Sequence, residues 1–431
     1  MEASRNKRLL ILAIKLGYQT RGFSDAAEKV GATVVFGTDR CHKLDDPWGD
    51  GALALQFEKP REAAEAIVRE LEGNPPDAIL ALGDRATSTA AFAAERFGIP
   101  GNAPAAVEAC RNKLRQRERL AASGVRVPEF LGISATEAVS EIASRAKFPC
   151  VLKPVALAAS QGVIRANTAV EFERAAARIR NLLASPEIQA MHEPQIDWLL
   201  AESYIPGREV AVEALLTDGR LRILAIFDKP DALEGPYFEE TIYVTPSRLS
   251  KESQAAIEKC AARTADALGL TTGPIHAEFR INEAGPWVLE MAPRPIGGLC
   301  SRALRFGRER ISLEELLIRD ALRMGGSEVD REERASGVMM IPVPRSGIFE
   351  GVDGLERAGE TEGIEEIRIT TRLRDYVAAW PEGSSYLGFI FATGPSPEKA
   401  EVALRAAHAT LSFRFSPRLP VEHPLKGNRR A

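Results

Sequence analysis

One stretch in the second half of the chain alternates apolar and polar residues and then doubles back on itself. Residues 273–281 read Gly-Pro-Ile-His-Ala-Glu-Phe-Arg-Ile, and residues 287–295 read Trp-Val-Leu-Glu-Met-Ala-Pro-Arg-Pro. Alternation with a period of two is typical of β-strands. The intervening Asn-Glu-Ala-Gly-Pro is a turn signal. The sequence therefore predicts a β-hairpin with two chemically different faces.

Two glutamates are predicted to face each other across this hairpin. If the turn is symmetric about Ala284, Glu278 lies directly opposite Glu290. Facing carboxylates about 5 Å apart repel each other unless a cation lies between them. A pair of carboxylates that holds Mg²⁺ against nucleotide phosphates resolves this repulsion, whereas the alternative is two solvated glutamates on an exposed face. On the first strand, one face is expected to carry Ile275, Ala277, Phe279 and Ile281, and the other His276, Glu278 and Arg280. On the second strand, one face is expected to carry Trp287, Leu289 and Met291, and the other Val288, Glu290 and Ala292.

Length and composition indicate a soluble protein of several domains. The 431 residues suggest about three domain-sized units, and 45% hydrophobic with 27% charged residues is typical of globular chains. A net charge of −4 gives no general attraction to nucleic acid or acidic membranes. No apolar run approaches the roughly 18 residues that a membrane helix needs. The five cysteines form no CxxC or zinc spacing, so we expect a reducing, cytoplasmic location.

The first 112 residues alternate predicted strands and helices. Strands are expected at 9–14, 33–36 and 77–83, and helices at 24–30 (with a Ser24 cap), 60–71 and 86–97. This rhythm predicts a small parallel sheet, with Gly83 and Asp84 at the carboxyl edge where ligands usually bind. Neither a G-x-G-x-x-G fingerprint nor a P-loop motif occurs, which argues against a dinucleotide site and the usual P-loop.

Residues 113–335 carry most of the residues suited to chemistry, in a fixed order. Lys113 comes first. Lys153 ends an apolar strand and precedes the loop Ala-Ala-Ser-Gln-Gly-Val at 158–163. The segment Glu-Ser-Tyr-Ile-Pro-Gly-Arg-Glu follows at 202–209, and the paired glutamates and Arg294 come last. From 336 onward, further strands and a helix at 397–411 predict a small α+β domain.

Taken in this order, these residues resemble the ATP-grasp superfamily of carboxylate–amine ligases. The resemblance covers nearly the whole chain and is strongest from Asn112 to Arg302. Within the superfamily the chain is similar to the L-amino acid ligases that make dipeptides, through residues 290–298, 227–230 and 239–246. The resemblance implies an α/β protein with an α+β core and three parts: an N-terminal parallel α/β domain (1–112), a central ATP-grasp domain (113–335) and a C-terminal α+β lid-like domain (336–431).

The resemblance assigns ATP-binding residues. Lys113 and Lys153 would hold phosphates as point charges, and Ser160 and Gly162 lie in a loop that would cover the phosphates with backbone N–H groups. Glu209 would accept hydrogen bonds from the ribose hydroxyls. For Lys113 a solvated helix charge is the rival interpretation, and for Glu209 an exposed strand glutamate. The adenine-binding group would be Glu202, Tyr204 and Ile205, largely through backbone atoms.

The resemblance also assigns metal and catalytic residues. Glu278 and Glu290 match Mg²⁺ ligands, with Mn²⁺ as an alternative. Ala292 replaces the asparagine that many members use as a third ligand, which leaves open whether one or two ions bind. Arg294 matches the arginine that stabilises an acyl-phosphate-like transition state, with Lys153 as its catalytic companion. Gly297 and Gly298 would let a substrate carboxylate approach the backbone.

Several further residues have two interpretations each. His276 would contact substrate or the metal's surroundings, or be a satisfied strand histidine. Lys229 would reach phosphate or substrate. Glu239 and Glu240 would bind a substrate amine or form a solvated acidic pair. Cys300 is better explained as a small buried filler than as a nucleophile.

The expected function is an ATP- and Mg²⁺-dependent ligase that activates a carboxylate as an acyl phosphate and joins it to an amine. Both substrates would be small molecules, with amino acids favoured, and the superfamily leaves a homodimer open. One alternative is a bicarbonate-activating enzyme like biotin carboxylase, although Pro-Ile-Gly-Gly after Arg294 argues against it. The other is a non-catalytic ATP-binding regulatory protein.

Overall fold

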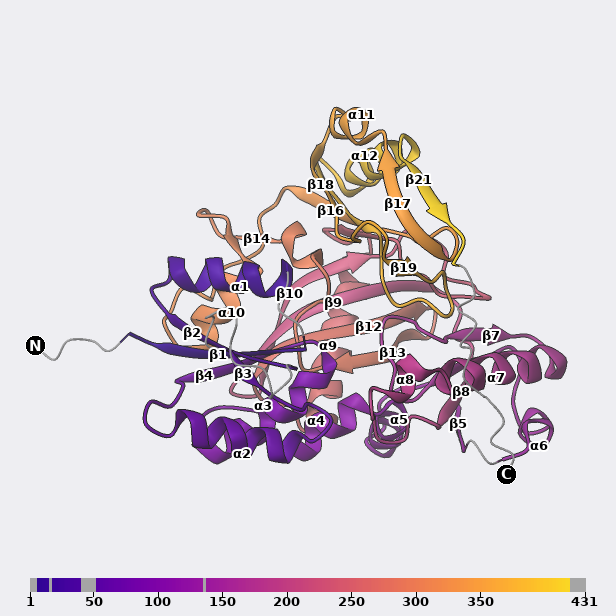
Figure 1. Ribbon diagram of the computed structural model, residues 1–431, viewed down its shortest axis with the longest axis horizontal. Helices are drawn as coiled ribbons and strands as arrows, with labels where there is room; N and C mark the ends of the chain where they lie inside the picture. Colours follow the sequence, from indigo (N-terminus) through magenta and orange to yellow (C-terminus); the bar gives the residue numbers. More distant parts are fainter. Residues whose placement is uncertain (1–5, 15–17, 40–51, 135–136, 419–431) are drawn as a thin grey trace, which may run out of the picture.

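The computed structural model describes residues 6–14, 18–39, 52–134 and 137–418, and Cys41 therefore lies outside the described residues. Figure 1 shows three regions arranged around a long central sheet: the N-terminal strands at one end, the β5–β8 region at the other, and the C-terminal strands and helices above. No helix in the described part of the chain is long and apolar enough to cross a membrane.

The N-terminal region is a parallel sheet with helices on both faces. Its strand order is β3 (Leu53–Ala54), β2 (Thr33–Thr38), β1 (Arg8–Ala13), β4 (Ala78–Leu82), and all three neighbouring pairs are parallel. This confirms the expected parallel sheet. Alternate residues of β1 enter opposite cores, because Leu9 and Ile11 belong to one cluster and Leu10 and Leu12 to another.

Four helices accompany this sheet, namely α1 (Tyr18–Lys29), α2 (Pro60–Leu71), α3 (Asp84–Phe97) and α4 (Pro104–Arg111). The helix expected at 24–30 begins at Tyr18, so Ser24 lies inside it and the predicted Ser24 cap is wrong. The apolar face runs through Phe23, Ala26 and Ala27, all buried, on both sides of that serine. Helix α3 begins directly after β4, at Asp84.

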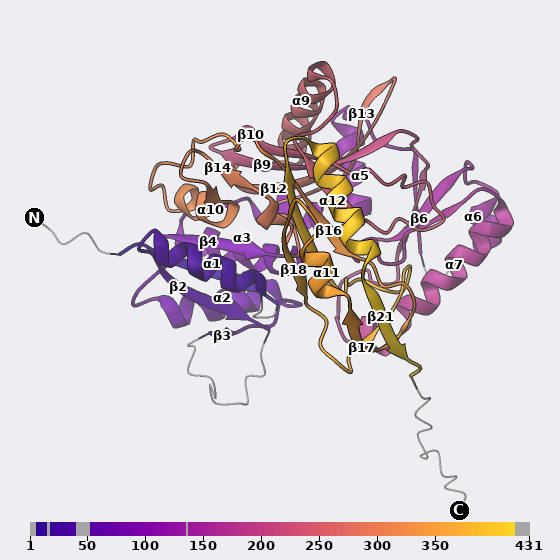
Figure 2. The ribbon, with the colours of Figure 1, turned by 90° about the horizontal axis from the view of Figure 1, so that it is seen from above.

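The central sheet has eight antiparallel strands, and Figure 2 shows α9 (Lys251–Leu268) packed beside it. The side chain of Ser250 caps α9 by accepting from the N–H of Ser253, and Gly269 ends the helix with φ +75°. Ile257 and Ala261 of α9 pack in one buried cluster with Phe279. The strand order is β13 (Gly285–Ala292), β12 (Gly273–Asn282), β9 (Arg208–Thr217), β10 (Arg220–Asp228), β11 (Ile242–Thr245), β16 (Ala335–Ile341), β20 (Gly388–Gly394), β18 (Ile364–Ile369).

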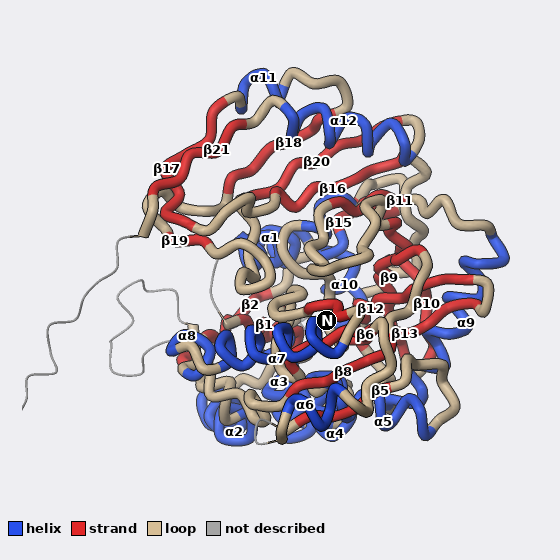
Figure 3. The backbone as a smooth tube through the Cα atoms, turned by 90° about the vertical axis from the view of Figure 1, so that its right-hand side faces the viewer, coloured by secondary structure: helices blue, strands red, loops and turns tan. Residues whose placement is uncertain are grey.

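The sheet runs without a break across the boundary expected at residue 336, because β11 pairs with β16. The remaining C-terminal elements lie over this end of the sheet, where α12 (Pro397–Ala409) and α11 (Leu355–Gly359) cover the strands in Figure 3. β17 (Gly347–Asp353), β19 (Tyr376–Val377) and β21 (Ser412–Ser416) also belong to this C-terminal end. The 3₁₀ turn Cys300–Ala303, β14 (Arg305–Phe306), β15 (Ile311–Ser312) and α10 (Leu313–Ala321) lead back toward the N-terminal region, where α10 packs against α1 (Figure 1).

A second antiparallel sheet forms the region at the far end from the N-terminus. Its order is β5 (Phe130–Ile133), β8 (Leu199–Ser203), β6 (Cys150–Pro154), β7 (Ile164–Ala166). Helix α7 (Ala169–Leu183) packs on this sheet through Phe172, which is fully buried with Leu152. Helices α5 (Lys113–Ala122), α6 (Val139–Ala143) and α8 (Pro186–Gln189) complete the region.

The β12–β13 hairpin confirms the pairing of Glu278 with Glu290 but corrects the reason for it. The turn pairs Asn282 with Gly285, which alone would place Leu289 opposite Glu278. A β-bulge between Glu278 and Phe279 adds one residue and restores the expected pair. The expected alternation in β13 is therefore wrong at the bulge: Val288 joins Met291 in the core, whereas Leu289, expected on the face of Met291, lines the cavity beside Glu290.

Candidate active site

A cavity of about 680 Å³ opens where the three regions meet. The face of β12 that carries His276 and Glu278 lines it, and the opposite face packs on α9, as the hairpin pattern predicts. All of the predicted site residues except Gly162, Lys229 and Glu239 line this cavity. Its C-terminal wall consists of Met340, Thr370, Thr371, Asp375, Tyr376, Val377, Ser384, Ser385, Tyr386 and Phe389.

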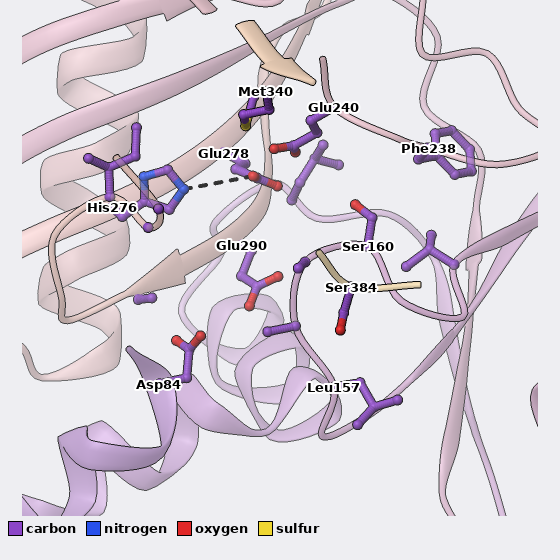
Figure 4. Close-up of a pocket in the computed structure, with 18 of the residues that line it drawn as sticks. Asp84, Leu157, Ser160, Phe238, Glu240, His276, Glu278, Glu290, Met340 and Ser384 are labelled. Atoms are coloured by element: carbon purple, nitrogen blue, oxygen red, sulfur yellow. Dashed lines mark ion pairs between the residues drawn. The ribbon is translucent and has the colours of Figure 1, made fainter. Parts of the chain in front are cut away.

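Glu278 and Glu290 project from the hairpin into the cavity (Figure 4). Their side chains are 22% and 30% exposed, and each has a cationic neighbour. Glu290 lies 3.4 Å from Nζ of Lys113, and Glu278 lies 3.2 Å from Nζ of Lys229. Burial alone would raise the pKa of Glu278, but the nearby Lys229 and His276 cations hold it well below its usual range. Glu278 therefore presents an ionised carboxylate, the kind of oxygen ligand that Mg²⁺ prefers.

Lys229 is buried beneath these acids instead of facing the cavity. Its Nζ lies 2.8 Å from Glu209, 2.5 Å from Glu240 and 3.2 Å from Glu278, and its side chain is 3% exposed. Carboxylate oxygens of these three glutamates lie within 4.8 Å of one another, a spacing that suits a cation. The Lys229 ammonium already occupies the space between the three carboxylates. We therefore interpret the trio as acids whose charge is balanced by Lys229, and not as a metal site. Burial and Glu278 raise the pKa of Glu240 to about 7.

His276 is held by an ion pair on the same strand face. Its Nδ1 lies 2.5 Å from Oε1 of Glu213, and the other oxygen of Glu213 accepts from the N–H of Ile296 at 3.0 Å. Burial alone would lower the pKa of His276, but Glu213 raises it to about 9. Nε2 lies 3.8 Å from Glu278, as the dashed line in Figure 4 marks. The imidazolium therefore helps to keep Glu278 ionised.

Arg294 reaches the cavity from the end of the hairpin and is anchored by the first residue of α3 in the N-terminal region. Its Nε donates to Oδ1 of Asp84 at 2.8 Å. Burial alone would raise the pKa of Asp84, but Arg294 lowers it, and Asp84 in turn raises the pKa of the guanidinium. Asp84 is the first residue of α3 and is separated from β4 only by Gly83, so it lies at the carboxyl edge where ligands were expected. The strand end and the hairpin thus supply one ion pair at the cavity wall.

Lys153 belongs to a buried triad with Glu202 and Arg117. Oε2 of Glu202 lies 2.5 Å from Nζ of Lys153, and Oε1 lies 2.5 Å from Nε of Arg117. Burial alone would raise the pKa of Glu202, but the two cations lower it; burial also lowers the pKa of Lys153, which Glu202 opposes. The Glu202 carboxylate, expected near adenine, therefore fixes the lysine, while Glu202 still lines the cavity.

Lys113 starts α5 and points into the cavity instead of into solvent. Asn112 caps this helix by accepting from the N–H of Arg115, which places Lys113 at the first turn. Its Nζ donates to the carbonyl of Leu157 at 2.6 Å, and the side chain is 11% exposed. The structure thus favours the site interpretation over a solvated helix charge.

Glu209, Tyr204 and Ile205 surround Arg280 at the nucleotide end of the predicted site. Glu209 accepts from Arg280 at 2.9 Å and from Lys229 at 2.8 Å, so it is not the exposed strand glutamate of the rival interpretation. The Arg280 guanidinium lies 5.0 Å from the centre of the Tyr204 ring and donates to the carbonyl of Ile205 at 2.9 Å. These contacts fix the strand end at which the sequence predicts an adenine-binding group.

The loop at 158–163 divides its residues between the cavity and the C-terminal region. Ser160 lines the cavity (Figure 4), but Gly162 does not, because its N–H donates to the carbonyl of Pro381 at 2.8 Å. Gly297 and Gly298 both line the cavity, and the ring of Phe389 packs against Gly298. Cys300 borders the cavity but is only 2% exposed, and burial raises its pKa far above the ordinary thiol value, which favours a filler over a nucleophile.

Arg117, Arg280 and Glu213 are the site residues that sequence reasoning missed. Each acts by holding a predicted residue: Arg117 holds Glu202, Arg280 holds Glu209, and Glu213 holds His276. The sequence contained a signal for two of them. Arg280 shares the charged face of β12, and Glu213 is a charged residue inside the otherwise apolar strand β9. Arg117 stands among several basic residues of one helix and carries no such signal.

Family models match three stretches of the chain. An ATP-grasp N-terminal domain matches residues 24–101, an ATP-grasp domain matches 146–303, and the L-amino acid ligase C-terminal domain 2 matches 339–416. These stretches lie within the three parts expected from the sequence, and the last contains all of the C-terminal wall of the cavity.

Curated relatives cover parts of the chain at modest identity. An uncharacterized protein, y4rH, of Sinorhizobium fredii (strain NBRC 101917 / NGR234) is 26% identical over 74% of this chain and 64% of its own length. The alanine–anticapsin ligase of Bacillus subtilis (strain 168) is 28% identical over 56% of this chain and 53% of its own length. The chain thus spans only about half to two thirds of these relatives.

A solved structure matches nearly the whole chain. The L-amino acid ligase from Bacillus licheniformis superposes with a TM-score of 0.80 at 28% identity, covering 96% of this chain and 100% of that one. The expected α/β fold with its ATP-grasp core is thereby confirmed. The chain therefore consists largely of ATP-grasp N-terminal and ATP-grasp domains followed by an L-amino acid ligase C-terminal domain.

Proposed function

We propose that this protein is an ATP- and Mg²⁺-dependent ligase that joins the carboxylate of one amino acid to the amine of a second. The observation that carries the proposal is the single cavity into which Glu278, Glu290, Lys113, Lys153 and Arg294 all project. Two acids, two lysines and an arginine around one space suit the transfer of a phosphoryl group, where catalysis is mainly positioning and charge neutralisation.

The residues present fit a divalent cation and a nucleotide. Glu278 and Glu290 are paired across the hairpin, and both keep part of their surface open to the cavity. Mg²⁺ bound there would neutralise phosphate charge. Lys113 and Lys153 would bind the phosphates, and Glu209 would accept hydrogen bonds from the ribose hydroxyls. Within the described residues no group accepts the N–H of Ile205, which leaves that donor available to a ring nitrogen of adenine.

The proposed reaction has two steps. A carboxylate oxygen of the first substrate attacks the terminal phosphorus of ATP, and the bond from that phosphorus to the ADP oxygen breaks. The amine of the second substrate then attacks the acyl carbon, phosphate leaves with the oxygen that came from the carboxylate, and the amine loses a proton. Arg294, fixed by Asp84, would bind the phosphoryl oxygens in both steps.

The alanine–anticapsin ligase and the L-amino acid ligase among the relatives support amino acids as substrates. A bicarbonate-activating enzyme is the weaker candidate, because residues 339–416 match the L-amino acid ligase C-terminal domain. A regulatory ATP-binding protein would have no need of Asp84 to orient Arg294. We propose domain limits of 1–112, 113–335 and 336–431, with the sheet shared by the last two.

The test is a matrix of paired amino acids and small carboxylates with Mg²⁺ and ATP, in which released phosphate and product mass are both measured. The matched control is Glu290→Gln, which keeps the shape of the side chain and removes the charge. The proposal expects one or more pairs to give phosphate together with a product lighter by one water than the sum of both substrates, and none in the variant. Phosphate release with bicarbonate alone, or ATP binding without turnover of any pair, would overturn it.

A further inference from the structure

The loop at 158–163 is bound on its outer side by residues 380–382 of the C-terminal region. Three hydrogen bonds make this contact. The N–H of Gly162 donates to the carbonyl of Pro381 at 2.8 Å, the side chain of Gln161 donates to the carbonyl of Glu382 at 2.7 Å, and the indole of Trp380 donates to the carbonyl of Ala159 at 3.3 Å. The two segments are more than 200 residues apart in the sequence.

A forked ion pair extends the same contact to helix α7. Nε and Nη2 of Arg178 lie 2.5 Å and 2.9 Å from the two carboxylate oxygens of Glu382. Paired N–H···O bonds of this kind fix orientation as well as distance. Arg178 also donates to the hydroxyl of Tyr237. The C-terminal region thus binds both the loop at 158–163 and helix α7 of the β5–β8 region.

The loop needs such external contacts because its own backbone is unfavourable. Ala159 and Ser160 have φ of +55° and +54°, a region that L-residues with a side chain rarely adopt. Each such residue costs of the order of 1 kcal/mol relative to an ordinary conformation. Partners outside the loop must therefore hold it, and residues 380–382 supply three of the hydrogen bonds that do so.

The held loop forms part of the cavity wall. Ser160 lines the cavity, and so do Ser384 and Tyr386, which follow residues 380–382 in the chain. The Trp380 ring packs 5.0 Å from the ring of Tyr386 and is 7% exposed. The loop and the segment around residues 380–386 therefore close the same side of the cavity together.

We propose that Arg178, Gln161, Trp380 and Glu382 are positioning residues that keep this side of the cavity closed. This inference rests on the proposed ligase function. An acyl phosphate is consumed either by the amine or by water, and a closed site excludes water. Weakening these contacts would admit water, which would hydrolyse the acyl phosphate, so that phosphate is released without an equal amount of amide.

The experiment compares Arg178→Glu, Glu382→Arg and the double exchange with the wild type in the full-length protein. The first readout is the ratio of phosphate released to amide formed. Each single variant places like charges opposite each other, and we expect the ratio to rise about fivefold, at the upper end of what a partly exposed pair contributes. The double exchange restores opposite charges and returns the ratio to within about twofold of the wild type. Arg174→Glu, an exposed residue one turn earlier on α7, is the matched control and leaves the ratio unchanged.

A second readout needs neither nucleotide nor turnover. Hydrogen exchange of a peptide covering residues 158–163 reports the Gly162 N–H, whose acceptor is Pro381. We expect faster exchange in each single variant and protection again in the double exchange. Unchanged exchange and an unchanged ratio in both single variants would overturn the inference, as would a double exchange that restores neither. A wild type that makes no amide from any pair would contradict the ligase proposal instead, and the exchange measurement would still decide whether the grip exists.

Discussion

Oε2 of Glu202 lies 2.5 Å from Nζ of Lys153, and both side chains are almost fully buried. The carboxylate is shared with Arg117, so one negative charge fixes two cations at the wall of the cavity. Removing one member of such a buried group leaves uncompensated charge in a poorly solvated place, which is far more costly than the loss of a surface pair. The lysine proposed to bind phosphate is therefore positioned by the interior of the protein.

Glu202→Gln tests this arrangement. We expect the variant to lose about 3 kcal/mol of unfolding free energy, because Arg117 and Lys153 stay buried without a counter-charge. The matched control is Glu129→Gln, which removes the partner of Lys147 in a pair whose side chains are 67% and 73% exposed. That change should cost less than about 1 kcal/mol. Urea unfolding measures both, and equal losses in the two variants would refute the role given to Glu202.

Asp84→Asn tests whether the N-terminal sheet orients Arg294. The amide keeps the size of the side chain and removes the charge that Arg294 pairs with at 2.8 Å. A charge-assisted hydrogen bond contributes about 1.5–3 kcal/mol. We therefore expect kcat to fall at least about tenfold, while the affinity for ATP stays close to the wild type. Steady-state kinetics separate the two, and an unchanged kcat would exclude the positioning role.

Gly298→Ala and Gly297→Ala form a matched pair of variants for the wall of the cavity. A Cβ on Gly298 would lie 2.9 Å from Cζ of Phe389, and φ is +63° there, whereas a Cβ on Gly297 meets nothing within 4 Å. We expect Gly298→Ala to lose about 1–2 kcal/mol and Gly297→Ala to change stability by less than about 0.5 kcal/mol. Thermal unfolding compares them, and a larger loss for Gly297→Ala would contradict the packing described.

Glu239 predicts how stability depends on pH. Burial raises its pKa to about 7, the Val343 N–H opposes the shift, and its Oε1 has no hydrogen-bond partner among the described residues. The unfolded chain releases this proton near pH 4.5 and the folded chain near pH 7, so folded stability falls between these values as pH rises. Glu239→Gln removes this loss. With partial exposure taken into account, we expect the variant to be more stable by about 1–2 kcal/mol at pH 8.

The same variant should match the wild type at pH 5, because the folded protein then carries a neutral carboxyl group at position 239. Chemical denaturation of both proteins at pH 5 and pH 8 measures the difference. A stability gain that is equal at the two pH values would show that the effect is not due to ionisation.

The sequence predicted the elements and the cavity-facing residues better than the partners of those residues. A turn assumed to be symmetric about Ala284 placed Glu278 opposite Glu290, although the observed register depends on a β-bulge that no residue type indicated. Local patterns show which side chains face a site, but partners such as Arg117 and Glu213 come from distant segments, and only folding brings them together. For the same reason Lys229 was expected at the cavity, whereas the structure buries it among three acids.

The central claim is that a carboxylate is activated by phosphorylation before the amine attacks. The most direct measurement uses an acid substrate labelled with ¹⁸O in both carboxylate oxygens and determines the mass of the phosphate released during amide formation. The account predicts that each phosphate formed with an amide carries one ¹⁸O and that the amide retains the other. Amide formation with unlabelled phosphate would contradict the acyl-phosphate route.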